Sequence, residues 1–128
     1  MPFADVVADV IAHLDPVDGV SVSSKVPSPR PDEFIQIRRI GGPGVPPVTE
    51  VVRLDVFTWA DTGPRAMELL GLVRESIWAL AGGVALGYVV YGVVEFMGPT
   101  QSDDTETSTP RGWYRPELTV RADAVIHS

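Results

Sequence analysis

Few side chains in this sequence have the chemistry that catalysis needs. The chain has no cysteine and only two histidines, His13 and His127. His13 falls on the polar side of a predicted helix, and His127 lies next to the chain end, where fraying prevents a general base from being held in position. We expect both histidines to be solvated. The sequence therefore predicts no catalytic residue and no enzymatic activity.

Three other groups of residues could hold a ligand, but each has a simpler interpretation. Asp15 and Asp18 could act as paired carboxylates, although aspartates beside a proline are ordinary turn formers. The acidic residues of 103–106 could bind calcium, but they lack the central glycine and distal glutamate of an EF-hand loop. Gly41 to Pro47 resembles a phosphate-binding loop only in composition, because its prolines lack N–H donors and no lysine follows. We predict no metal and no cofactor.

Composition excludes several further classes of function. Ten basic and seventeen acidic residues give a net charge of −7, which disfavours stable binding to nucleic-acid phosphates. The lack of cysteine excludes disulfides and thiolate metal sites. Met1 to Asp9 has no basic residue at which a secretory signal could start, so export is not expected. Ser76 to Val94 is uncharged and long enough to span a bilayer, but Gly82 and Gly83 interrupt it, and we predict no membrane span.

The elements that position these residues can be read from hydrophobic spacing. Apolar residues three and four apart predict a helix from Phe3 to Leu14. The first half of the chain continues with a strand over Gly19 to Val26, an exposed proline-rich bend over Pro27 to Pro31, a strand over Phe34 to Ile40, and a projecting loop over Gly41 to Pro47.

The second half is predicted to hold a long strand, a helix and two more strands. The long strand runs from Val48 to Ala60, and the helix begins at Thr62 or Gly63 and packs on the sheet. The remaining segments are strands over Tyr88 to Met97 and Glu117 to Ile126, joined by a long polar loop over Gly98 to Gly112.

These elements fit one domain, residues 1–128, of the α+β class. We expect an antiparallel or mixed β-sheet of four to five strands, with two helices packed on one face and long projecting loops. Arg38, Arg39 and Arg53 form the only concentration of basic residues, and either pair with carboxylates of another subunit or form a solvated strand face. Trp113 and Tyr114 border the polar loop and are candidates for either an interface or the core.

Five segments together resemble one family of virion proteins. They are the N-terminal helix, the run Pro29 to Ile35 leading to Arg39 to Gly42, the run Leu54 to Asp61 before the second helix, the loop Pro99 to Asp104, and Pro110 to Tyr114 before the last strand. With these segments nearly the whole chain resembles the tail terminators, or tail-completion proteins, of siphoviruses, which are long-tailed bacteriophages, particularly those that infect actinobacteria.

The resemblance implies a structural virion protein that is assembled in the host cytoplasm. In that family a ring, usually of six subunits, sits on the head-proximal end of the tail tube, terminates tube polymerisation and joins the tail to the head connector. The implied partners are copies of the chain, the major tail-tube protein and the head-tail connector or stopper protein. DNA passes through the lumen without specific binding, which suits an acidic protein.

The predicted interface residues combine the basic group, the two loops and the aromatic pair. They are Arg38, Arg39, Gly41, Gly42, Pro43, Gly44, Arg53, Asp103, Asp104, Glu106, Arg111, Trp113 and Tyr114. Two alternatives stay open at this point. One is another head-tail connector protein, such as a head-closure or adaptor protein. The other is a small ligand-binding domain or enzyme that uses the sheet face around Arg38 and Arg53 as a pocket.

Overall fold

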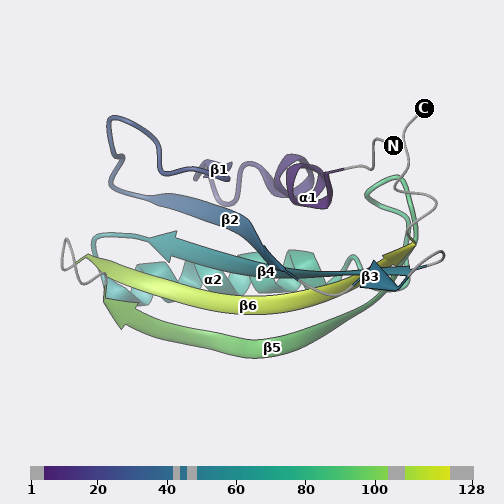
Figure 1. Ribbon diagram of the computed structural model, residues 1–128. Helices are drawn as coiled ribbons and strands as arrows, with labels where there is room; N and C mark the ends of the chain where they lie inside the picture. The colour runs from purple at the N-terminus through teal and green to yellow at the C-terminus, as the bar shows by residue number, and fades with distance from the viewer. Residues whose placement is uncertain (1–4, 42–43, 46–48, 104–108, 122–128) are drawn as a thin grey trace.

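The computed structural model describes residues 5–41, 44–45, 49–103 and 109–121 (Figure 1). Its helices are α1 (Val6–Leu14) and α2 (Gly63–Trp78). Its strands are β1 (Val22–Ser23), β2 (Phe34–Gly41), β3 (Gly44–Val45), β4 (Thr49–Trp59), β5 (Val90–Asp103) and β6 (Pro110–Arg121). The predicted single α+β domain is confirmed.

Five of the strands lie side by side in the order β1-β2-β4-β6-β5, and β3 pairs with the start of β4. β1 runs parallel to β2, whereas the other neighbours are antiparallel, so the sheet is mixed, which is one of the two predicted arrangements. In the β2–β4 register, Phe34 lies opposite Trp59 and Ile37 lies opposite Val56. Since neighbouring residues of a strand point to opposite faces, this register decides which side chains share a face.

Both helices pack on the same face of the sheet, where they build the core. Val6, Val10 and Leu14 of α1 join the core-facing side chains of β2, β4 and β6 in one cluster with α2. Figure 1 shows α2 running behind β4 and β6, with α1 beside β1 and β2. The predicted packing of α2 on the sheet is confirmed, because the apolar residues along one side of α2 and just after it are at most 1% exposed: Ala66, Leu69, Leu70, Val73, Ile77 and Leu80.

Local signals set the ends of the helices. Asp5 caps α1 by accepting a hydrogen bond from the Ala8 amide (3.1 Å), and Thr62 caps α2 by accepting one from the Arg65 amide (3.3 Å). After α2, Gly82 adopts a positive φ of 78° in the turn that leads to β5. This turn divides the uncharged stretch of the sequence, and no helix in the described part of the chain is long and apolar enough to cross a membrane.

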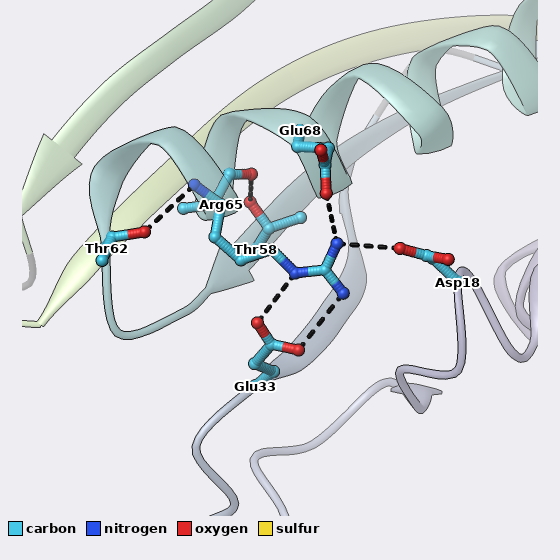
Figure 2. Close-up of polar contacts among 7 residues, drawn as sticks. Asp18, Glu33, Thr58, Thr62, Arg65 and Glu68 are labelled. Atoms are coloured by element: carbon cyan, nitrogen blue, oxygen red, sulfur yellow. Dashed lines mark hydrogen bonds and ion pairs between the residues drawn. The ribbon is translucent and has the colours of Figure 1, made fainter.

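An arginine at the start of α2 ties the helix to two distant segments (Figure 2). The Nε of Arg65 donates to Glu33 Oε2 (2.8 Å), and its Nη1 donates to Asp18 Oδ2 (2.8 Å) and to Glu68. These hydrogen bonds, chiefly the one with Glu33, raise the pKa of Arg65, so its charge is permanent. Arg65 therefore fixes α2 against the turn after α1 and against the chain that enters β2.

The start of α2 also packs closely against β4 and β6. The Thr58 hydroxyl donates to the carbonyl oxygen of Ala66 (2.7 Å), as Figure 2 shows. On β6, Gly112 leaves no space for a side chain, since an added Cβ would lie 2.5 Å from Thr58 Oγ1 and 3.0 Å from a methyl carbon of Leu70. The helix therefore docks directly on the backbone of β6.

Two predicted boundaries in the first half of the chain differ from the structure. The strand expected over Gly19 to Val26 is reduced to β1, because Asp18 and Gly19 both have positive φ in a turn and prolines follow. Within the predicted loop Gly41 to Pro47, β3 forms a short ladder with β4. The end predicted for the last strand lies outside the described residues.

The prediction of a polar loop over Gly98 to Gly112 is wrong for most of that segment. β5 continues to Asp103 and β6 already begins at Pro110, with Thr100 paired to Trp113. Polar residues are tolerated here because β5 is an edge strand on which alternate side chains are exposed. Pro116 lies where the β4–β6 pairing is interrupted and next to a register shift in the β5–β6 pairing, so the strand accommodates it at an irregular position.

Candidate functional site

An aromatic cluster covers the sheet face opposite the helices. Phe34 of β2, Phe57 and Trp59 of β4, and Trp113 of β6 point to this face and pack together. The ring centroids of Phe34 and Trp59 are 4.5 Å apart, and those of Phe57 and Trp113 are 5.6 Å apart. The cluster thus crosses three neighbouring strands.

Arginine side chains lie over these rings and cover them. Arg38 and Arg111 lie 5.3 and 5.0 Å from the centroid of Phe57, Arg30 lies 5.1 Å from Phe34, and Arg115 lies 5.1 Å from Trp113. Each distance is within the range of a cation–π contact. Beneath this layer Phe34, Phe57 and Trp59 are no more than 6% exposed. The outer surface of the face is therefore made of guanidinium groups.

One buried carboxylate holds the arginines in place. Asp55 is 1% exposed and accepts hydrogen bonds from Trp113 Nε1 (2.9 Å) and Arg115 Nε (2.8 Å). Arg38 approaches its other oxygen at 3.6 Å. A carboxylate at this depth requires such partners. Asp55 therefore binds one arginine from β2 and one from β6, on either side of its own strand.

The face extends to the edge of the sheet through a second ion pair. Arg53 donates from Nη2 to Glu117 Oε2 (2.6 Å) and stacks 4.2 Å from the ring centroid of Phe96 on β5. Phe96 is 57% exposed and Val94 is 62% exposed. Apolar side chains this exposed, next to arginines, are typical of surfaces that bind other macromolecules.

We name this surface the arginine–aromatic face and define it by eleven residues: Arg30, Phe34, Arg38, Arg53, Asp55, Phe57, Trp59, Arg111, Trp113, Arg115 and Glu117. Its five arginines and two carboxylates give it a net charge of +3, in a chain whose net charge is −7. Guanidinium groups bind carboxylates and phosphates in a planar, bidentate manner. The chemistry of this face is therefore suited to an acidic partner.

Two of the arginines are held by longer contacts than Arg53 and Arg115. The Arg38 side chain is 55% exposed, and its ion pair with Asp55 is shared with Arg115. Arg111 hydrogen-bonds an uncharged group, the Ser102 hydroxyl, at 3.2 Å. Both therefore have donors available to a partner at the surface.

Four of the predicted interface residues come together on this face. Arg38, Arg53, Arg111 and Trp113 all belong to it, although they derive from three strands. Arg39 lies apart from them at the end of β2, where it pairs with Glu50 at 2.8 Å.

Tyr114 lies on the opposite face, in the core. It is 0% exposed, and its hydroxyl accepts a hydrogen bond from Trp78 Nε1 (3.1 Å). Burial is the main cause that raises the pKa of Tyr114 to about 12. Neighbours in a strand point to opposite faces, so Trp113 and Tyr114 have different environments.

The predicted loop residues lie at strand ends or outside the described part. Gly41 ends β2, Gly44 begins β3 and Asp103 ends β5, whereas Gly42, Pro43, Asp104 and Glu106 lie outside the described residues.

The turn carboxylates that were considered as a pair both have structural partners. Asp15 Oδ1 accepts a hydrogen bond from the Val22 amide (3.0 Å), and Asp18 binds Arg65. In the part of the chain that the structure describes, no group of three or more histidine or acidic residues could hold a metal ion.

Sequence reasoning missed the other members of the face, which are Arg30, Phe34, Asp55, Phe57, Trp59, Arg115 and Glu117. A signal was present, because every second residue from Arg53 to Trp59 and from Arg111 to Glu117 is aromatic or charged. The prolines at 110 and 116 concealed the second run by arguing against a strand.

No protein-family model matches the chain, and no curated protein matches it at a significant level.

Proposed function

We propose that this protein is a structural protein of a long-tailed bacteriophage virion and acts as its tail terminator. In this role copies of the chain form a ring, of six subunits in the family that it resembles, on the head-proximal end of the tail tube. The ring stops tube polymerisation and joins the tail to the head connector. It acts as a binding surface and not as an enzyme.

One observation carries this proposal: three of the five segments that resemble the tail-terminator family supply residues of the arginine–aromatic face. The run Pro29 to Ile35 supplies Arg30 and Phe34, the run Leu54 to Asp61 supplies Phe57 and Trp59, and the run Pro110 to Tyr114 supplies Trp113. Tryptophan and arginine are enriched at the centres of protein interfaces. The resemblance therefore coincides with the surface whose chemistry is most suited to binding other subunits.

The chemistry of the face also supports binding over catalysis. Its two carboxylates, Asp55 and Glu117, are both ion-paired to arginines and hold them in position. A general base needs a free lone pair directed at a substrate proton. Paired in this way, both carboxylates serve to orient cations.

Deletion of the gene from the phage genome tests the proposal. We expect lysates with tails of uncontrolled length, or with tails that do not join heads, when they are examined by electron microscopy. Wild-type protein supplied in trans should restore virions, whereas the variant Arg38→Ala/Arg111→Ala should not. Lys25→Ala, which removes an exposed charge that is not among the residues of the face, serves as the matched control. Normal tails and intact virions without the gene contradict the proposal.

The same lysates separate a terminator from a head-closure or adaptor protein. Antibody labelling should place a terminator on free tails that lack heads. If the label is found only on tail-less heads, the chain is a head-side connector protein instead.

A further inference from the structure

The charges of this chain are segregated between its two sides. Opposite the arginine–aromatic face lies the helix layer, which we define as α1, α2 and the charged residues that cap or contact them. It holds eight carboxylates, Asp5, Asp9, Asp15, Asp18, Glu33, Glu68, Glu75 and Glu95, and two arginines, Arg65 and Arg74. Its net charge is therefore −6, against +3 on the arginine–aromatic face.

We infer that the arginine–aromatic face of one copy of this chain docks on the helix layer of the next copy. This contact rests on the proposed function, because it specifies how neighbouring subunits of the ring meet. Face against face would bring +3 toward +3, and layer against layer would bring −6 toward −6. Only the face-to-layer arrangement joins opposite charges, so electrostatics selects a heterologous contact.

A shallow hollow in the helix layer has a lining whose chemistry suits an arginine side chain. It measures about 320 Å³ and lies between α2 and the turn that follows α1. Its walls include the apolar side chains of Leu14, Val17 and Leu72, and its border carries the carboxylates of Asp18 and Glu75. An arginine can place its methylene groups along such walls while its guanidinium binds the carboxylates. Arg38, half exposed on the opposite face, is an arginine of this kind.

A heterologous contact leaves one face and one layer free on every dimer, so further copies add until the ring closes. The exposed Val94 and Phe96 at the margin of the arginine–aromatic face would add apolar burial to the same contact. The occupant is a second copy of this chain, since the chain itself supplies the complementary surface.

Two variants test the contact, one on each side. The face variant, Arg38→Gln/Arg111→Glu, lowers the charge of the face from +3 to 0 and keeps a hydrogen-bonding group beside Asp55. The layer variant, Glu68→Gln/Glu75→Lys, changes exposed residues of α2. Lys25→Gln is the matched control. Circular dichroism establishes that each variant is folded before its association is measured.

The readout is the mass of the assembly, measured by native mass spectrometry and sedimentation. We expect wild-type protein and the control to associate at low salt, and the association to weaken as salt rises from about 0.05 to about 0.5 M. Each variant alone should associate on the order of 10- to 100-fold more weakly. An equimolar mixture of the two should form a 1:1 dimer and stop there, because it contains one intact face opposite one intact layer.

Three outcomes overturn the inference. They are a wild-type chain that stays monomeric at about 1 mM and low salt, a layer variant that associates as the wild type does, and a mixture that forms no dimer. One further outcome also contradicts the inference. If the wild-type monomer binds a labelled oligothymidine and the face variant does not, the face binds nucleic acid instead.

The two proposals fail separately. Dimers in the mixture together with normal tails in the deletion phage leave the contact standing and remove the tail function. Aberrant tails in the deletion phage, together with wild-type association of both variants, support the tail function and remove the proposed contact.

Discussion

Replacing Asp55 with alanine is expected to lower the free energy of unfolding by about 3 kcal/mol. The Asp55 side chain is 2% exposed and contacts two arginines. Its removal leaves Arg115, which is 27% exposed, and Trp113 Nε1 without their acceptor. Arg38 is 55% exposed and can be rehydrated.

The magnitude follows from these exposures. Breaking a fully buried ion pair costs about 3–5 kcal/mol. Partial hydration of the arginines places Asp55→Ala at the lower end of that range. For a chain of 128 residues, an unfolding entropy of about 2.1 cal/mol/K per residue converts 3 kcal/mol into a fall of roughly 11 °C in Tm.

Urea unfolding and differential scanning calorimetry measure the loss. The matched control is Glu117→Ala, which breaks the Arg53–Glu117 pair at 22–30% exposure and should cost about 1 kcal/mol or less. Asp55→Asn should fall between them, since an amide oxygen can still accept from Trp113 but carries no charge. If Asp55→Ala costs no more than Glu117→Ala, Asp55 does not organise the arginine–aromatic face as argued.

Four further predictions concern the packing of α2 and the core. Gly112→Ala should lower stability by about 1–3 kcal/mol, because the new methyl group would lie 2.5 Å from Thr58 Oγ1. Gly71→Ala, on the exposed side of α2 with nothing within 4 Å of the added carbon, should raise stability by roughly 0.5–1 kcal/mol in the same urea titration. The raised pKa of Tyr114, about 12 in the folded chain, keeps its phenol protonated where the unfolded chain, with a pKa of 10.0, already ionises. The stabilising contribution of the protonated Tyr114 phenol is complete below pH 10 and is lost as pH rises toward 12. Tyr114→Phe should therefore flatten the fall of the unfolding free energy with pH over that range. Equal slopes for the wild type and the variant would contradict the raised pKa of Tyr114. Arg65→Met should speed amide hydrogen exchange in the turn after α1 and at the start of α2 while β5 and β6 keep wild-type rates, and uniform acceleration would show that Arg65 acts on the whole fold.

Patterns that lie within one element were sufficient to predict much of the fold. The stripe from Ala66 to Leu80 and the cap at Thr62 identify α2, and the β-branched and aromatic runs identify β2 and β4. Each of these signals depends on one element having one buried face, which the order of residues expresses directly. The prediction of an antiparallel or mixed sheet with two helices on one face followed from the order of such elements.

The lengths of β5 and β6 depended on their neighbours instead. Gly98–Asp103 is too polar, and Pro110 and Pro116 are too unfavourable, to predict a ladder from local preference. Pairing with an adjacent strand satisfies the backbone of both segments and leaves the polar side chains exposed at an edge. Tertiary context therefore outweighed local propensity here.

The candidate site shows the same division. Residue types indicated that Arg38, Arg53, Arg111 and Trp113 could bind a partner, but they did not indicate that these residues form one surface. Their proximity depends on the register across β2, β4 and β6, which separations of up to 75 positions along the chain leave unspecified. The alternation of side chains along β6 also places Trp113 on the arginine–aromatic face and Tyr114 in the core. Composition and local periodicity determined the elements of this protein, whereas strand pairing alone decided which side chains face outward together, because contacts between strands join residues that are distant in sequence.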